Sequence, residues 1–256
     1  MGGSPLFTFL SYLSFLKKAK GPHSLHSPFV FTLYKEVIKP SSHFRLKKIE
    51  GLRRSLRNNH QLIDAIDFKT NTSKRKTLSS IAGSSLSSAK FSAFLHLLIN
   101  HLHSNIILET GTSLGINTLY LATAGGTKTV TIEGSIILAE LAKKQFERMG
   151  ASDILIESGD VNKIFQSVVV RHEPDFVFLD ADHRGATILN QVEILLQNEM
   201  KPRCIVIHDI YWSKDMNETW KRLVKDERFN LTIDIFQAGL IFSGKNMEKQ
   251  HFTLRF

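Results

Sequence analysis

The pattern of hydrophobic and polar residues changes character near residue 105. From Asn105 onward, short and nearly continuous apolar runs alternate with longer segments in which apolar residues recur every three or four positions. The first pattern predicts buried strands, and the second predicts amphipathic helices. Strands are expected at 106–110, 128–133, 153–157, 175–180, 203–208, 230–236 and 238–243, and helices at 115–124, 135–149, 160–170, 185–197 and 214–226.

This alternation indicates an α/β fold. Strands as apolar as Phe176-Val177-Phe178-Leu179 are typical of a parallel sheet that helices cover on both faces. The last two predicted strands are joined without room for a helix, so we expect them to pair antiparallel. The predicted architecture is a Rossmann-like, doubly wound, seven-stranded sheet that is mostly parallel and ends in an antiparallel hairpin.

The N-terminal part has a different pattern. Residues 5–69 are predicted to be helical, with Ser27-Pro28 as the N-cap and first position of one helix. Residues 69–76 contain no apolar side chain and are predicted to form an exposed linker or mobile loop. We therefore expect a helical extension over residues 1–77 and an α/β domain over residues 78–256. A further helix, 89–102, is expected at the start of that domain.

The apolar run near the start of the chain could be a targeting or membrane segment. It covers 5–16, and its lysines (Lys17, Lys18 and Lys20) follow the run, whereas a secretory signal carries them before it. The run is also shorter than the roughly 20 residues that cross a bilayer. We expect a cytoplasmic protein without stable membrane insertion. Because this helix is apolar nearly all round, it is predicted to be buried against the domain or a second subunit, as in a homodimer.

The charge is unevenly distributed. The formal net charge is +9, and residues 1–80 hold 15 Lys and Arg against 4 Asp and Glu. Such a basic region keeps a protein soluble, or serves acidic substrates, nucleic acid or an anionic membrane surface. The single cysteine, Cys204, excludes an internal disulfide and lies in an apolar run, which indicates an inert buried thiol.

A glycine turn gives the clearest indication of function. The apolar run 106–108 leads into Glu109, and Gly111 and Gly115 follow just before a helical pattern. A strand, a glycine turn and a helix in this order let the backbone approach a ligand closely. Glu133 ends the next apolar run, 18 residues after Gly115, where an acid can accept hydrogen bonds from a ribose diol. The expected ligand is a nucleoside-containing cofactor.

Five ordered motifs carry a resemblance to a known family. They are Glu109-Thr-Gly-Thr-Ser-Leu-Gly115, Glu133, Gly159-Asp160, Leu179-Asp-Ala-Asp-His183 and His208-Asp-Ile-Tyr-Trp212. Over residues 78–256 the chain resembles the class I S-adenosylmethionine-dependent methyltransferases, and in particular the small-molecule O-methyltransferases known from bacteria. The resemblance implies S-adenosylmethionine as cofactor and methyl transfer to a small-molecule acceptor, at a hydroxyl oxygen.

The resemblance also implies a set of cofactor-binding residues, all at the carboxyl ends of strands, where open α/β sheets bind their ligands. Gly111 and Gly115 would let the backbone reach the methionine part, and Glu109 would meet its ammonium group. Glu133 would hold the ribose, and Asp160 the adenine amino group while also capping a helix. The predicted cofactor-binding set is Glu109, Gly111, Thr112, Ser113, Gly115, Glu133, Gly134, Asp160 and Asp180.

A methyl transfer needs alignment of the reactants and removal of a proton from the acceptor. Asp180, Asp182 and His183 follow one strand, and His208 and Asp209 follow the next. The candidate bases are Asp180, His183, His208 and Asp209, with Asp180 and His183 preferred. Tyr211 and Trp212 could stack on the acceptor or on adenine, or fill the core.

Magnesium is not expected. In the resembling enzymes, the acid that matches Asp180 and an Asp-Asn pair after the fifth strand bind a divalent metal. The matching pair here is Asp209-Ile210, and an isoleucine side chain cannot bind a hard cation. We therefore predict no metal site. A metal at Asp180 and Asp209, with Asp182 or His208 as the substitute ligand, is the alternative.

Two other functions compete with methyl transfer. A nicotinamide-dependent oxidoreductase is disfavoured because Asn117-Thr118 occupy the region of the third glycine, and because the terminal hairpin is unexpected for that fold. A nucleic-acid-binding or nucleic-acid-methylating protein is suggested by the basic N-terminal part. It is disfavoured because motifs for flipped bases, zinc spacing and interleaved aromatic and basic residues are missing from the sequence. We expect no nucleic-acid partner.

Overall fold

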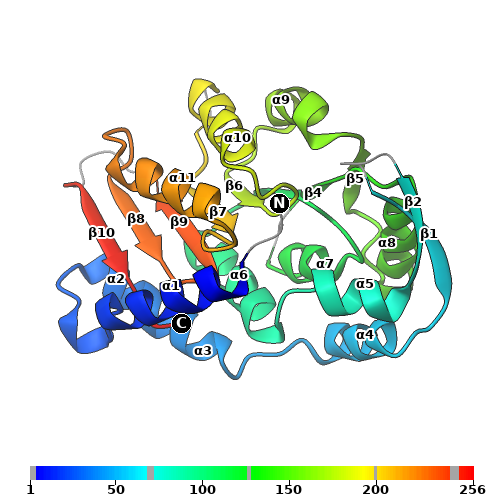
Figure 1. Ribbon diagram of the computed structural model, residues 1–256, viewed down its shortest axis with the longest axis horizontal. Helices are drawn as coiled ribbons and strands as arrows, with labels where there is room; N and C mark the ends of the chain where they lie inside the picture. The colour runs from blue at the N-terminus through cyan, green and yellow to red at the C-terminus, as the bar shows by residue number, and fades with distance from the viewer. Residues whose placement is uncertain (1–3, 68–71, 126–127, 199–200, 243–247) are drawn as a thin grey trace.

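An eight-stranded sheet forms the centre of the computed structural model, which describes residues 4–67, 72–125, 128–198, 201–242 and 248–256 (Figure 1). Across the sheet, the strands lie in the order β10 (Gln250–Thr253), β8 (Leu231–Asp234), β9 (Ala238–Phe242), β7 (Cys204–His208), β6 (Phe176–Leu179), β3 (Ile106–Thr110), β4 (Lys128–Glu133) and β5 (Leu155–Ser158). The predicted α/β class, parallel sheet and antiparallel hairpin are confirmed.

One strand of the sheet was not predicted. Strand β10 pairs parallel to β8 at the edge of the sheet. Its sequence, Gln250-His-Phe-Thr253, has a single apolar residue, so its pattern gives no sign of a buried strand. Its backbone hydrogen bonds come from β8, a partner that lies about 20 residues earlier in the chain. Tertiary pairing therefore decides this element.

Helices cover both faces of the sheet. The helices α9 (Val161–His172), α10 (Gly185–Gln197) and α11 (Lys214–Lys225) share one apolar core on the first face. The helices α6 (Ala89–Leu102), α7 (Ile116–Ala122) and α8 (Ile136–Met149) lie on the other face (Figure 1). Ser88, Ser135, Asp160 and Ser213 accept hydrogen bonds from backbone N–H groups as N-caps of α6, α8, α9 and α11.

The path of the chain through the sheet fixes where a ligand can bind. From β3 the chain moves outward through β4 to β5, and it then returns to β6 on the other side of β3. The order of strands therefore reverses between β3 and β6. At such a point the loops that follow the strands diverge and leave a crevice at their carboxyl ends.

Part of the N-terminal region joins the core as helices. The elements are α1 (Pro5–Lys18), η1 (Pro22–Ser24), α2 (Pro28–Leu33), the π-helical η2 (Tyr34–Ile38), α3 (Lys39–Ser41) and α4 (Lys47–Arg57). Val30, Leu33 and Val37 are fully buried in the same core as α6. Ser27 caps α2 by accepting a hydrogen bond from the N–H of Val30, as predicted.

The prediction of helix up to residue 69, followed by a linker, was wrong. Helix α4 ends at Arg57, and β1 (Leu62–Asp67) and β2 (Thr72–Thr77) form an antiparallel pair. Residues 68–71 of the predicted linker lie outside the described residues. The apolar spacing fits a helix as well as a strand, and the cross-strand hydrogen bonds decide between them. After β2 comes α5 (Leu78–Ser85), which Thr77 caps.

Helix α1 is not buried against the domain, and its burial by a second subunit stays a prediction. Only Phe15 is buried, and six large apolar side chains are exposed: Leu6, Phe9, Leu10, Tyr12, Leu13 and Leu16. The helix lies beside the C-terminal segment, where Lys20 donates a backbone hydrogen bond to Thr253 (Figure 1). No helix among the described residues is long and apolar enough to cross a membrane.

Candidate active site

The predicted motifs meet at the crevice beside β3 and β6. The carboxyl ends of the strands and residues 84–87 enclose a cavity of about 910 Å³, which we call the cofactor cavity. Nine of the predicted site residues line it: Gly111, Ser113, Glu133, Gly134, Asp160, Asp180, His183, His208 and Asp209. Glu109, Thr112 and Gly115 are not among the lining residues.

The two glycines have different roles in the turn. Gly111 has a φ of +91°, and a Cβ on it would lie 3.0 Å from the carbonyl oxygen of Asp180. The turn therefore packs directly on the backbone that follows β6, and only glycine fits there. Gly115 has a φ of +78°, and a Cβ there would lie 2.5 Å from the ring of Phe146. This glycine therefore lets α7 pack closely on α8.

Glu133 is a buried acid and not an ordinary surface side chain. Its two carboxylate oxygens accept hydrogen bonds from the backbone N–H groups of Ser113, at 2.7 Å, and Ser135, at 2.8 Å. Burial raises the pKa of Glu133, and the hydrogen bonds act in the opposite direction. These bonds fix the carboxylate at the edge of the cofactor cavity, and each oxygen keeps a lone pair for a ligand hydroxyl.

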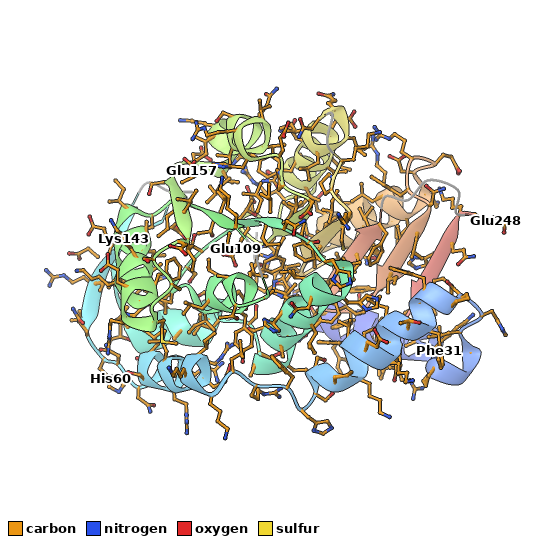
Figure 2. The ribbon with its side chains drawn as sticks, turned by 180° about the vertical axis from the view of Figure 1, so that it is seen from behind. Phe31, His60, Glu109, Lys143, Glu157 and Glu248 are labelled. Carbon is orange, nitrogen blue, oxygen red and sulfur yellow. The ribbon has the colours of Figure 1, made fainter. Side chains whose placement is uncertain are left out.

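Glu109 lies beneath the cavity, at the centre of the molecule (Figure 2). Its Oε2 accepts hydrogen bonds from the hydroxyls of Thr118, at 2.5 Å, and Thr131, at 2.8 Å. Thr112 completes this network through a 2.7 Å contact with the hydroxyl of Thr131. The other oxygen, Oε1, is buried without a hydrogen-bond partner among the described residues. Burial raises the pKa of Glu109 to about 8. The buried carboxylate form is therefore disfavoured at neutral pH, and a cation bound nearby would stabilise it.

Asp160 has a structural role in addition to the predicted one. Its Oδ1 accepts a hydrogen bond of 3.0 Å from the backbone N–H of Asn162, and it thereby caps α9. The residue also lines the cofactor cavity. Helix capping is thus observed, and contact with adenine is still a prediction.

Two imidazoles and two carboxylates meet at the ends of β6 and β7. His208 Nδ1 lies 2.7 Å from Asp180 Oδ1. His183 Nε2 lies 3.5 Å from Asp180 Oδ1 and 3.4 Å from Asp209 Oδ2. The four predicted catalytic residues therefore form one cluster, which we call the histidine–aspartate cluster.

The charges of this cluster stabilise one another. Burial disfavours ionisation, but the two imidazoles outweigh it and lower the pKa of Asp180 to about 2. Burial likewise disfavours the protonated histidines, but Asp180 and Asp209 raise the pKa of His183 to about 9 and also raise that of His208. The cluster can therefore hold a proton at neutral pH and release it in mildly alkaline solution.

The backbone around Asp209 aims its carboxylate at the cluster. Asp209 has a φ of +54°, in the left-handed region that few non-glycine residues adopt. Its N–H donates a hydrogen bond of 2.7 Å to the carbonyl of Gln237, which holds this conformation. The neighbouring acid Asp182 is turned away and pairs with Arg184 and with the hydroxyl of Thr187. Asp182 is thus not available as a substitute metal ligand.

The cluster does not fit magnesium. Mg²⁺ requires six oxygen ligands in nearly ideal octahedral geometry. Here Ile210 is fully buried, and the ring nitrogens of His183 and His208 lie beside the carboxylate of Asp180. Two imidazole nitrogens and one carboxylate are a donor set for a transition metal rather than for a hard cation. We therefore derive no catalytic step from magnesium.

The two aromatic residues after β7 have different roles. Tyr211 donates a hydrogen bond of 2.6 Å to Asp234 and stacks on Phe236, with the ring centroids 4.8 Å apart. It therefore fills the core and does not face the cofactor cavity. Trp212 lines the cavity, is 45% exposed, and has its ring 5.8 Å from that of His183. Of the two, only Trp212 is placed to contact an acceptor.

The serine-rich wall of the cavity was not predicted from the sequence. Residues 84–87 form one side of it, and the hydroxyl of Ser85 lies 2.7 Å from that of Ser113 in the glycine turn. The serine-rich composition of 79–88 was visible in the sequence, but it is equally typical of a loop. Only the fold brings α5 to the turn.

Comparisons with known proteins agree with this geometry. A family model described as O-methyltransferase matches residues 59–236. Among solved structures, cofactor-bound Rv0187 from MTB is similar at 17% identity and a TM-score of 0.60, over 82% of this chain and 95% of that chain. The SAH-bound methyltransferase PaMTH1 from Podospora anserina is similar at 15% identity and a TM-score of 0.57, over 79% and 97%.

A third solved structure, an O-methyltransferase from Bacillus cereus in complex with SAH, has 14% identity and a TM-score of 0.55, over 82% and 98% of the two chains. At these identities the likeness shows the fold. No curated protein matches the sequence. The family match supports neither the oxidoreductase nor the nucleic-acid alternative, and the prediction of an O-methyltransferase is confirmed. The chain belongs to the O-methyltransferase family.

Proposed function

We propose that this enzyme binds S-adenosylmethionine in the cofactor cavity and methylates a hydroxyl oxygen of a small-molecule acceptor at the histidine–aspartate cluster. The observation that carries this proposal is the set of carboxylates around the cavity. Five acids line it (Glu133, Asp160, Asp180, Asp182 and Asp209), and they outnumber the basic lining residues, which are Arg184, His183 and His208. This lining favours a cationic cofactor such as a sulfonium, and it repels the pyrophosphate of a nicotinamide dinucleotide.

The residues around the cavity match the parts of the cofactor. Glu133 would accept hydrogen bonds from the ribose diol, and Asp160 would accept one from the adenine amino group. Glu109, with its unpaired Oε1, would attract the ammonium of the methionine part through the glycine turn. Gly111, Ser113 and Gly134 keep the backbone near the ligand, while Thr112 and Gly115 support the turn from behind.

Bound S-adenosylmethionine supplies an already activated methyl group, so the protein must orient the acceptor and remove its proton. We assign proton removal to His183, because its side chain is more exposed than that of His208, at 25% against 14%, and because it faces Trp212. Asp180 orients both imidazoles and stabilises their protonated forms. Asp209 contributes the second negative charge near His183.

We propose a cytoplasmic enzyme, in line with its single buried cysteine, Cys204. We propose that the exposed side chains Leu6, Leu10 and Leu13 of α1 support a homodimer and that no nucleic acid is bound. We also propose that the α/β domain begins at residue 78.

Calorimetric titration tests the proposed cofactor. S-adenosylhomocysteine should bind the wild-type protein, and NADH should give no heat. Glu133→Ala should weaken the binding of S-adenosylhomocysteine by at least ~10-fold, because a buried carboxylate that accepts ligand hydrogen bonds is lost. The matched control is Glu248→Ala, at an exposed acid far from the cavity (Figure 2). Equal affinity of wild type and Glu133→Ala would contradict the proposed site.

A further inference from the structure

A second cavity lies beside the cofactor cavity. It has a volume of about 920 Å³ and lies between α1, the turn that joins β8 to β9, and the C-terminal segment. We call it the apolar chamber. Its size is that of a pocket for a drug-sized ligand. It is lined by residues that are more than 200 positions apart in the sequence, so it exists only because α1 packs beside the C-terminal segment (Figure 1).

The lining of the chamber is apolar and basic. Phe9 and Tyr12 of α1 line it together with Phe236 and Phe256. Its only charged lining residues among those described are Lys90 and Arg255, and no Asp or Glu lines it. Lys90 Nζ lies 4.2 Å from the centroid of the Phe256 ring, and neither cation has an ion-pair partner among the described residues. An anion could therefore gain two charge partners there without displacing a carboxylate.

The turn that forms one wall is strained. Phe236 has a φ of +67°, which is a rare conformation for a bulky residue. Its N–H donates a hydrogen bond of 2.8 Å to Asp234, and its ring contacts those of Tyr12 and Tyr211. The next residue, Gln237, has its Oε1 buried without a hydrogen-bond partner among the described residues. The fold thus holds an aromatic ring and an unpaired acceptor in the wall of the chamber.

The chamber adjoins the histidine–aspartate cluster. Trp212 lines both cavities, and Ser87 of the cofactor cavity is followed directly by Ser88 of the chamber. The wall of the chamber is also bonded to the cluster, because the carbonyl of Gln237 accepts the hydrogen bond of the Asp209 N–H. A molecule that fills the chamber could thus extend past Trp212 toward His183.

We propose that the apolar chamber binds the methyl acceptor, and that this acceptor is an amphipathic acid. Its aromatic or acyl body fills the chamber, its anionic group pairs with Lys90 and Arg255, and its hydroxyl extends past Trp212 to the cluster. The inference rests on the proposed function, and it specifies the chemical class of the methyl acceptor. The apolar lining favours the aromatic or acyl part of the acceptor, and the two cations, which have no ion-pair partner in the described part of the chain, favour its anionic group.

Binding of simple amphiphiles tests the chamber without any reaction. The probe is 8-anilinonaphthalene-1-sulfonate, whose fluorescence reports its displacement by decanoate, decan-1-ol or decylammonium. Decanoate should displace it at least ~10-fold more effectively than decan-1-ol, and decylammonium should be the weakest. The double variant Lys90→Gln/Arg255→Gln should lose the preference for decanoate over decan-1-ol and keep the affinity for the alcohol.

The matched control is Lys143→Gln/Arg148→Gln, which removes two exposed cations from α8, where Figure 2 shows Lys143 at the surface. It should behave as wild type. Titration of S-adenosylhomocysteine into each variant checks that the cofactor cavity is intact. If S-adenosylhomocysteine fails to bind the wild type, the proposed function fails, whereas the displacement data still test the chamber on their own.

A second measurement links the chamber to turnover. The probes are 3-(3,4-dihydroxyphenyl)propanoic acid and its primary amide, which have nearly the same shape, and only the acid is anionic. We expect at least ~10-fold higher kcat/KM for the acid, and near equality in Lys90→Gln/Arg255→Gln. Equal displacement by decanoate and decan-1-ol, or an acid preference that survives in the double variant, would overturn the proposal.

Discussion

Two cavities of nearly the same size lie side by side in this protein, at about 910 and 920 Å³, and their linings differ in polarity and charge. The cofactor cavity is lined by five carboxylates, one arginine and two histidines, whereas the apolar chamber is lined by aromatic side chains, two cations and no carboxylate. They meet at Trp212. The difference fits a reaction with two substrates, because a cationic methyl donor and an anionic acceptor would each be drawn to its own side.

The two cavities also differ in how they are built. The cofactor cavity is formed by short motifs that each follow one strand of the sheet. The chamber is formed by elements from both ends of the chain, and α1 contributes to it with only Phe15 buried. The first cavity is therefore part of the rigid sheet, while the second depends on a helix with few buried contacts.

The largest expected effect is that of Gly111→Val, which should disrupt ligand binding in the cofactor cavity and leave the apolar chamber unchanged. Valine would strain the left-handed turn and collide with the backbone of Asp180, which lies 3.0 Å from the added Cβ. Binding of S-adenosylhomocysteine, measured by calorimetry, should fall by at least ~100-fold, or about 2.7 kcal/mol. Displacement of the fluorescent probe from the chamber should not change, and a parallel loss there would show that the two cavities are not independent.

The second largest effect is expected on catalysis at the histidine–aspartate cluster. His183→Gln should lower kcat by roughly 100-fold, since a general base typically contributes that much. In the wild type, His183 has a pKa of about 9 and is protonated below it, so kcat/KM should rise with pH up to about pH 9. The same rise in His183→Gln would assign the titration to another group, with His208 as the first candidate.

A smaller effect tests the charge of the cofactor cavity. Glu109 has a pKa of about 8 and is therefore mostly protonated at pH 7. A bound cation favours the carboxylate, so S-adenosylmethionine binding at pH 7 should release a proton, and it should release less above pH 8. Calorimetry in buffers of different ionisation enthalpy measures this release. Glu109→Gln should abolish it, and an unchanged release in that variant would exclude Glu109 as its source.

Removal of metal should have the smallest effect. The donor set around Asp180 does not fit magnesium, so treatment with a chelator should change kcat/KM by less than about twofold. The measurement is methyl transfer before and after dialysis against EDTA, with metal content determined in parallel. Loss of activity that Zn²⁺ or Mn²⁺ restores, but Mg²⁺ does not, would instead assign a transition metal to His183, His208 and Asp180.

Much of the sheet was predictable, because its strands are apolar and its helices are amphipathic. The bounds of β3 and β4 agree with the prediction, and the helix predicted at 185–197 is observed there. The β1–β2 pair was not predictable, since Leu62, Ile63 and Ile66 fit a helical spacing equally well. The edge strand β10 was also missed because it contains one apolar residue.

The sequence predicted which residues belong to the candidate site, but it did not predict which contacts their side chains make. The motifs after β6 and β7 pointed to Asp180, His183, His208 and Asp209, and the parallel sheet brings them together. The sequence could not tell that Asp182 turns toward Arg184, or that Glu109 leaves one oxygen unpaired. Side-chain direction after a strand depends on the loop that follows, and each of these loops is shaped by distant contacts.

The sequence by itself determined seven of the eight strands, the family and the residues at the strand ends, because these follow from local periodicity and from motifs of fixed spacing. The tertiary structure decided the apolar chamber, the second role of Trp212 and the exposure of α1. These depend on which segments pack together across more than 200 residues. That outcome is set by the total buried surface and hydrogen bonding of the fold, which no local pattern encodes.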